Sequence, residues 1–372
     1  MPRPRTLLFL SALLFAFAGA VGLTPGLADG GANHQKRNTH FGVSGGNVND
    51  VSKAFCCSGT LGALVSDGST QYVLSNNHVL ARGDKAVAGE DVSQPGLIDS
   101  SCRVATVVAD FTAAPPLGSN VDAAIAALRA GAMDSTGFIE DVGVPGSTIR
   151  AAAVGLGVAK SGRTTGFTTG TVGSVNTSVN VQYQEGCNQG RKFTVSYTNQ
   201  VVINSGSFSA GGDSGSLIVT NDTAHSPVAL LYAGSSSTTI GNPIGEVLDK
   251  LSQALGRSVS FGGGGTGGGG GGGPRGGASS AVQPYVPSFG GAMRELPQQA
   301  VENASAALER SRADLMSRPA VLGAGVGASE EDDQEAAIVI YVDRTAGFRP
   351  QLPESVEGVR VRVVLTDPFV AF

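Results

Sequence analysis

The chain has 372 residues, of which 41% are hydrophobic and only 15% are charged, and its formal net charge at neutral pH is −5. This length allows two folded domains with sizeable cores. The acidic balance argues against nucleic acid and against an anionic membrane surface as partners, because both require clustered Lys and Arg.

Residues 1–28 have the features of a secretory signal peptide. Arg3 and Arg5 precede an apolar run from Leu7 to Val21, and small residues at 18–20 and Ala28 offer cleavage sites. The run is shorter than the roughly 20 apolar residues that span a bilayer, so we expect no stable membrane insertion after cleavage. A retained N-terminal anchor is the alternative. The pattern predicts a secreted protein, extracellular or in the cell envelope.

Residues 29–51 are polar and rich in Gly and Asn, which predicts a flexible N-terminus of the mature chain. From 52 to 260, short β-type runs alternate with Gly, Ser, Asn and Asp. This pattern predicts an all-β sandwich or barrel. Ile244–Leu255 has apolar residues at helical spacing and Gly256 after them, so we expect one helix at the end of this domain.

Four cysteines lie in this region, and an even number in an oxidising compartment predicts two disulfides. A bond between neighbours Cys56 and Cys57 would be strained, so each is expected to pair with either Cys102 or Cys187. The sequence leaves both of those pairings open. A zinc site is the rival interpretation, but CxxC and HxxxH spacings are absent, and we predict no metal.

Residues 261–295 predict a glycine-rich linker, because 15 of the 31 residues from 261 to 291 are glycine. Glycine loses the most backbone entropy on ordering, which favours a flexible tether. Residues 296–372 then predict a small α+β module of unassigned role. Its acidic loop at 330–333 lacks the glycine-spaced ligands of a calcium site and is interpreted as solvated. The expected elements are a helix at Pro297–Met316 and strands at Val321–Gly327, Ala337–Val342 and Val359–Leu365.

Three local patterns carry the chemistry of this chain. His78 ends a β-type run in Leu-Ser-Asn-Asn-His-Val-Leu, Asp122 leads into the apolar run 123–128, and Ser214 lies in Gly-Gly-Asp-Ser-Gly. A serine hydroxyl becomes a nucleophile when an imidazole takes its proton, and a carboxylate behind the ring fixes the tautomer. The amides of Gly212 and Ser214 can stabilise a developing oxyanion. These residues predict acyl transfer from a peptide, with no cofactor.

The order His, Asp, Ser and the Gly-Asp-Ser-Gly sequence resemble the chymotrypsin/trypsin-like serine proteases, whose triad is a well-described template. Residues 160–166 and 170–172 are similar to a motif of the bacterial branch, the α-lytic protease and streptogrisin group. The stretches LSNNHVLA, VDAAIA and AGSSSTTIGNPI look closest to the trypsin-like peptidases related to plant NARROW LEAF proteins. The resemblance covers residues 55–256 and implies two six-stranded β-barrels, with His and Asp in the first and Ser in the second.

The resemblance also implies structural roles for two further residues. In the bacterial branch an internal arginine, here Arg163, pairs with the aspartate before the nucleophile, here Asp213. Such a pair would hold the oxyanion turn without a freshly cut N-terminal amine. The chain departs from the family where Asn76-Asn77-His78-Val79 replaces Ala-Ala-His-Cys, and where Ser216 replaces a further glycine.

For the substrate, the register of the animal enzymes places Phe208 at the floor of the specificity pocket. Ala233-Gly234-Ser235 resembles the edge strand that pairs with the substrate backbone. No acidic residue stands at that floor, so we expect a neutral, apolar side chain before the cleaved bond. The protein partners expected are peptide substrates and, within the chain, the module 296–372, which would bind substrate, inhibit the protease in cis or assist folding.

Two alternatives belong to other functional classes. A protease fold kept as a catalytically silent binding module would usually lack a triad member, and all three are present. An α/β-hydrolase cutting esters would need GxSxG and the order Ser, Asp, His, which this chain does not have.

Overall fold

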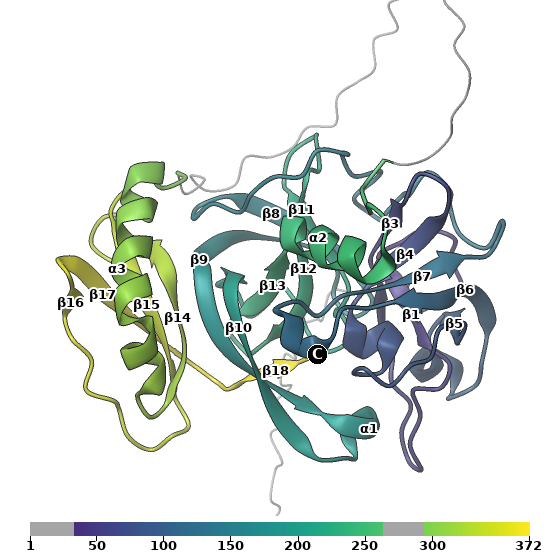
Figure 1. The fold of residues 1–372 in the computed structure, drawn as a ribbon, viewed down its shortest axis with the longest axis horizontal. Coiled ribbons are helices and arrows are strands. Elements are labelled where there is room, and N and C mark those ends of the chain that lie inside the picture. Colours follow the sequence, from purple (N-terminus) through teal and green to yellow (C-terminus); the bar gives the residue numbers. More distant parts are fainter. Residues whose placement is uncertain (1–32, 263–293) are drawn as a thin grey trace, which may run out of the picture.

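The computed structural model describes residues 33–262 and 294–372, arranged as Figure 1 shows. The predicted signal peptide and nearly all of the predicted linker therefore lie outside the described residues. Two curled sheets lie side by side, and a helix with its own strands flanks the second sheet. The all-β double barrel with a closing helix and a small α+β module is confirmed. In the described ranges no helix is long and apolar enough to cross a membrane.

The first sheet closes into an antiparallel barrel with the order β2-β1-β5-β6-β7-β4-β3. Its outer strands β2 and β3 are separated only by Gly62, so they are two halves of one bent strand that joins the sheet edges. A Cβ at position 62 would collide with the carbonyl oxygen of Gly215, so the bend requires glycine. The strands are β1 (Val43–Asn47), β2 (Gly59–Leu61), β3 (Ala63–Ser66), β4 (Gln71–Ser75), β5 (Asp91–Gln94), β6 (Thr106–Ala113) and β7 (Ala124–Leu128).

Strand β1 shows that the predicted flexible segment 29–51 is wrong over this stretch. All five residues of β1 are buried, and the strand pairs with β2 and β5. The glycines that suggested flexibility serve close packing instead. A Cβ at Gly45 would overlap the side chain of Leu61, and one at Gly46 would press on Ser58. Composition alone could not distinguish these two uses of glycine.

The second sheet is also a closed antiparallel barrel, with the order β10-β13-β12-β11-β8-β9 and a closing pairing between β9 and β10. Its fully buried strand β12 has the apolar sequence Pro-Val-Ala-Leu-Leu-Tyr-Ala-Gly. The strands are β8 (Gly157–Gly162), β9 (Gly166–Gln184), β10 (Lys192–Ile203), β11 (Leu217–Thr220), β12 (Pro227–Gly234) and β13 (Thr239–Pro243).

Helix α2 (Ile244–Leu255) follows the second barrel and packs against both barrels, on β12 of the second and β6 of the first. Its buried residues Ile244, Val247 and Leu251 join the same apolar cluster as Val43 and Leu74. Each fully buried aliphatic side chain contributes roughly 1.5–3 kcal/mol. The helix ends at Gly256, whose φ of 74° is the left-handed conformation that glycine adopts at low cost. The helix therefore fastens the two barrels to each other.

Two disulfides resolve the pairings that the sequence left open. Cys56 is bonded to Cys102, and Cys57 is bonded to Cys187. Cys187 lies in the short turn α1 (Glu185–Asn188) between β9 and β10. The second bond therefore links the first barrel to the far end of a hairpin of the second barrel.

The C-terminal module shares a sheet with the second barrel rather than standing apart. Strand β14 pairs antiparallel with β9, and helix α3 packs on β14 and contributes Leu308 and Leu315 to the cluster that holds Val172. In Figure 1, β18 runs from this module to the centre of the molecule. The elements are α3 (Gln298–Ser317), β14 (Val321–Ala328), β15 (Ala336–Asp343), β16 (Ser355–Val356), β17 (Val359–Thr366) and β18 (Phe369–Ala371).

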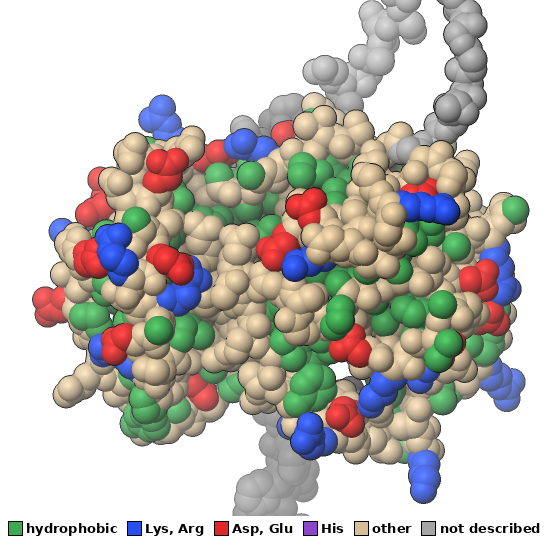
Figure 2. Space-filling view, viewed as in Figure 1, with side chains coloured by type: hydrophobic (Ala, Val, Ile, Leu, Met, Phe, Trp, Pro, Cys, Tyr) green, Lys and Arg blue, Asp and Glu red, His purple; other side chains and the backbone are tan. Residues whose placement is uncertain are grey.

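The face in Figure 2 shows Lys and Arg interspersed with Asp and Glu, without a continuous field of one sign. Many charged side chains of the described residues are paired, as Arg129 is with Asp110 and Arg344 with Asp367. This face offers no clustered basic patch of the kind that nucleic acid requires.

Candidate active site

His78 lies in a one-turn helical segment, Asn77–Ala81, directly after strand β4. The two asparagines before it hold this turn in place. Asn76 Nδ2 donates to the carbonyl oxygen of Asp122 at 2.6 Å, and Asn77 Nδ2 donates to that of Pro115 at 2.9 Å. Because both amides are buried, these bonds also satisfy groups that would be costly to leave unpaired. The turn thereby aims the imidazole at the space between the barrels.

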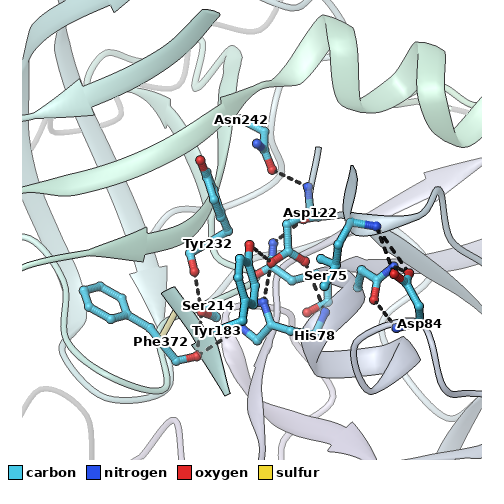
Figure 3. Close-up of polar contacts among 12 residues, drawn as sticks. Ser75, His78, Asp84, Asp122, Tyr183, Ser214, Tyr232, Asn242 and Phe372 are labelled. Carbon is cyan, nitrogen blue, oxygen red and sulfur yellow. Dashed lines mark hydrogen bonds and ion pairs between the residues drawn. The ribbon is translucent and has the colours of Figure 1, made fainter. Parts of the chain in front are cut away.

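Asp122 contacts His78 through both carboxylate oxygens. Its Oδ2 is 2.5 Å from Nδ1 of the ring, and its Oδ1 accepts the backbone N–H of His78 at 3.1 Å. The side chain of Asp122 is fully buried. The backbone N–H of Asp122 donates to Oδ1 of Asn242 at 2.9 Å, which ties the carboxylate to β13 of the second barrel (Figure 3).

Tyr183 is a site residue that the sequence did not reveal. It lies on β9, and its hydroxyl donates to Asp122 Oδ2 at 2.9 Å and hydrogen-bonds the hydroxyl of Tyr197 at 2.7 Å. Burial, followed by the negative charge of Asp122, raises the pKa of Tyr183 well above its ordinary value, so the phenol stays a donor. One signal was available in the sequence: Tyr183 follows Val179 and Val181 at a spacing of two, which places all three on the same, inward face of a strand. A tyrosine that faces inward needs a polar partner for its hydroxyl.

Ser214 lies in a tight turn that rests on the first barrel. Gly212 and Gly215 flank it with φ values of 98° and 95°, in the region that favours glycine. Thr60 holds the turn from the first barrel: its N–H donates to the carbonyl oxygen of Ser214 at 2.8 Å, and its hydroxyl donates to that of Gly212 at 2.9 Å. Within the described residues, the amides of Gly212 and Ser214 donate to no protein group.

A single atom links Ser214 to His78. The carbonyl oxygen of Phe372 accepts a hydrogen bond from Ser214 Oγ at 2.9 Å and lies 3.0 Å from His78 Nε2 (Figure 3). Ser214 Oγ also lies 3.2 Å from the carbonyl oxygen of Tyr232. The structure therefore brings His78, Asp122 and Ser214 to one place, with the imidazole touching the carboxylate on one side and facing the hydroxyl on the other.

The environment of His78 favours its protonated form. Burial lowers the pKa of the imidazole, but the charge and hydrogen bond of Asp122 outweigh it, with a smaller contribution from the Phe372 carbonyl. The pKa of His78 is therefore raised above its ordinary value. A base with a raised pKa accepts a proton more readily, which suits a group that must take one from a hydroxyl.

The predicted pairing of Arg163 with Asp213 is wrong. Arg163 binds Asp99 through two hydrogen bonds of 2.6 and 2.7 Å. Asp213 is held instead by Lys160, whose Nζ is 3.4 Å away, and by the amide of Thr164 at 2.8 Å and the hydroxyl of Thr165 at 2.7 Å. The positions of the two cations along the chain explain why Lys160 and not Arg163 contacts Asp213. Lys160 lies inside buried strand β8, whereas Arg163 follows the end of that strand.

The predicted substrate-binding residues separate into two groups. Phe208 is fully buried in the core of the second barrel, where a Cβ at Gly170 would press on its ring, and it does not line the cavity beside His78. Ala233 and Gly234, at the end of β12, do face the site and pair with Ala371 and Val370 of β18. Ser235 lies just beyond, with its hydroxyl 2.6 Å from that of Thr366.

A cavity of about 310 Å³ opens beside His78. It is lined by His78, by Gly211 and Gly212, by the Cys57–Cys187 disulfide and by Phe372, among others. It is large enough for several atoms of a ligand, and Ala371 at the end of β18 also lines it. Within the described ranges, no group of three or more His, Cys, Asp or Glu side chains is arranged to hold a metal ion.

Two closed antiparallel barrels with these residues between them define a peptidase of the chymotrypsin-like fold. The chain belongs to peptidase family S64, whose sequence model matches residues 51–255. No curated protein matches the chain.

Solved structures similar to this chain include three bacterial-type proteases. A glutamic acid-specific serine protease is 22% identical, with a TM-score of 0.41 over 59% of this chain and 98% of its own. Thermobifida fusca protease A is 19% identical, with a TM-score of 0.39 over 60% and 99%. An α-lytic protease homolog is 19% identical, with a TM-score of 0.36 over 60% and 98%.

Proposed function

We propose that this chain is a secreted serine endopeptidase that hydrolyses peptide bonds through an acyl-enzyme on Ser214. One observation carries the proposal. His78 contacts the buried carboxylate of Asp122 through Nδ1, while its Nε2 and the Ser214 hydroxyl reach the same carbonyl oxygen of a peptide segment. That arrangement places a base and a nucleophile within hydrogen-bond reach of one main-chain oxygen, that of Phe372.

The reaction follows from these contacts. His78 Nε2 takes the proton of Ser214 Oγ as the oxygen bonds to the substrate carbonyl carbon. The amides of Gly212 and Ser214 would stabilise the oxyanion, and removal of one such donor costs about 3–4 kcal/mol in a serine protease of unrelated fold. His78 then gives its proton to the departing amine as the carbon–nitrogen bond breaks. Water repeats the sequence on the acyl-enzyme, releasing the acid and restoring Ser214. Asp122 orients the imidazole throughout, and Tyr183 and Asn242 hold Asp122 in place.

Two features of the chain support secretion. Disulfides such as Cys56–Cys102 and Cys57–Cys187 persist mainly in oxidising compartments. The predicted signal peptide at residues 1–28 would supply the export step. Detection of a mature chain lacking these residues in the medium or cell envelope would test this part of the proposal.

A peptide-library digest tests the chemistry directly. The chain should cut internal peptide bonds, and Ser214→Ala should lower the rate by about 10⁴-fold or more, because removal of a triad member leaves only binding and oxyanion stabilisation. Ser207→Ala, a serine exposed on a nearby loop, is the matched control and should cut normally. Equal cleavage by the chain and by Ser214→Ala would show that another group does the chemistry, or that a contaminant does.

A further inference from the structure

Strand β18 lies in the groove between the two barrels as a bound peptide would. It pairs antiparallel with β12, where Ala371 opposes Ala233 and Val370 opposes Gly234. It also pairs in parallel with β9. The N–H of Phe372 continues this ladder by donating to the carbonyl oxygen of Tyr232 at 3.3 Å. Because hydrogen-bonded pairs alternate along an antiparallel ladder, Val370 forms the next hydrogen-bonded pair, with Gly234.

This pairing brings the main-chain oxygen of Phe372 next to Ser214 and His78. That oxygen touches both Ser214 Oγ and His78 Nε2. The ring of Phe372 lies against the α-carbon of Gly234, since a Cβ there would come 2.5 Å from the ring carbon Cζ. The ring also packs on the apolar core cluster of the second barrel. The ring of Phe372 therefore occupies the place that would hold the side chain of the substrate residue before the cleaved bond.

The start of the segment is anchored to the C-terminal module. Phe369 is fully buried, and its ring meets that of Tyr341 edge-on at 5.8 Å between centroids. Asp367, two residues earlier, pairs with Arg344 at 2.6 Å and hydrogen-bonds the hydroxyl of Ser236. These contacts fix where the chain enters the groove. They also keep residues 370–372 at a high effective concentration beside the site.

We propose that residues 369–372 occupy the acyl-side substrate subsites of this chain's own active site, inhibit it in cis, and mimic substrates that carry phenylalanine or a similar side chain immediately before the cleaved bond. This inference rests on the proposed function. It makes the module 296–372 an inhibitory element, one of three roles that the sequence left open. Ala371 and Phe372 also line the cavity of about 310 Å³ beside His78.

The inhibition has a measurable consequence. A substrate must displace β18. Its apparent affinity is therefore its intrinsic affinity multiplied by the fraction of molecules with an open groove. Phe372→Gly removes the half-buried ring and should raise both the fluorophosphonate labelling rate of Ser214 and kcat/KM for the tetrapeptide anilide Phe-Val-Ala-Phe by about tenfold or more. Phe348→Gly, an exposed phenylalanine of the same module, is the matched control and should change neither.

A second variant removes the main-chain contact rather than the ring. Val370→Pro deletes the N–H that pairs with Gly234 and should produce the same rise. Circular dichroism and thermal melting of each variant report whether the fold persists. The free peptide Thr-Asp-Pro-Phe-Val-Ala-Phe, which copies residues 366–372, should inhibit Phe372→Gly competitively, and the same peptide ending in Gly should bind about tenfold more weakly.

The outcomes separate this inference from the proposed function. Equal labelling of the unaltered chain, Phe372→Gly and Val370→Pro would overturn cis inhibition while leaving Ser214 an activated nucleophile. Absence of labelling in all of them would overturn the proposed function and this inference together. Two further anilides, Phe-Val-Ala-Lys and Phe-Val-Ala-Glu, test the substrate class. Faster cleavage of either one than of the Phe-Val-Ala-Phe anilide would overturn the preference that we assign.

Discussion

At the scale of single residues, substitution of Tyr183 tests whether its hydrogen bond orients Asp122. Tyr183→Phe removes the hydroxyl that donates to Asp122 Oδ2 and leaves the Tyr197 hydroxyl without that partner. We expect a loss of about 1–3 kcal/mol in the free energy of unfolding and about a tenfold fall in kcat/KM. The carboxylate would then act more strongly on His78, so the acid limb of the pH–rate profile should move to higher pH. Chemical denaturation and that profile measure both effects. An unmoved acid limb would contradict the assigned contact.

Substitutions of Lys160 and Arg163 together test which cation holds Asp213 in the turn before Ser214. Lys160→Met leaves the fully buried Asp213 without a cation, which we expect to cost about 3 kcal/mol or more of stability and most of the activity. Arg163→Ala breaks the contact with Asp99 instead and should spare the turn, so its loss of kcat/KM should be smaller. Denaturant melts and steady-state kinetics of the two variants decide this. A larger loss of activity in Arg163→Ala would restore the pairing predicted from the sequence.

Three catalytic candidates were accessible from sequence because each stands in a chemically distinctive local pattern. His78 ends a strand, Asp122 precedes an apolar run, and Ser214 lies between glycines. Tyr183 and the Lys160–Asp213 contact were not accessible, because both depend on which strand faces which across a barrel. The partner of a side chain depends on the tertiary fold. The counter-ion of a lysine in a strand can be identified only when the register of the neighbouring strands is known.

At the scale of elements, the two disulfides should differ in effect. In the chain-entropy treatment, the Cys57–Cys187 bond, which spans 130 residues, stabilises by about 5 kcal/mol. The Cys56–Cys102 bond, which spans 46, stabilises by about 4 kcal/mol. Cys57 and Cys187 also line the cavity beside His78, so replacing both by Ser should lower kcat/KM as well as stability. The double Ser variant at 56 and 102 is the control and should mainly lose stability. Equal losses of activity would contradict a role in shaping the cavity.

The elements themselves were predicted unevenly from the sequence. Helix α2 follows its apolar spacing, spans the expected Ile244–Leu255 and is capped by Gly256. Strand β1 was missed because its glycines resemble those of a loop, although they serve close packing against Leu61 and Ser58. Strand β18 was missed because three residues carry no periodic signal. The module 296–372 was recognised as α+β. Its pairing with β9 could not be predicted, because the sequence does not show that β9 offers an exposed edge.

At the scale of the whole molecule, activity should rise with pH as His78 loses its proton. Because Asp122 raises the pKa of His78, the midpoint of kcat/KM should lie above the ordinary value of about 6.5. The same raised pKa means that protonated His78 stabilises the fold below the unfolded-state pKa, and that this stability is lost as pH rises through the folded pKa. The main-chain oxygen of Phe372 also favours the protonated ring, so Phe372→Gly should lower the midpoint if it releases β18 from the groove, as we propose. Proton NMR titration of the imidazole would measure each value, and a higher midpoint in the variant would contradict this account.

The central claim is that Ser214 is activated by His78 across the space between two barrels. The most direct measurement is fluorophosphonate labelling, located by mass spectrometry, in the Phe372→Gly background, where we expect the groove to be open. The account predicts one adduct on the peptide that holds Ser214, abolished by Ser214→Ala and slowed by about 10³-fold or more in His78→Ala. An adduct on another residue, or labelling of His78→Ala at the unaltered rate, would contradict it.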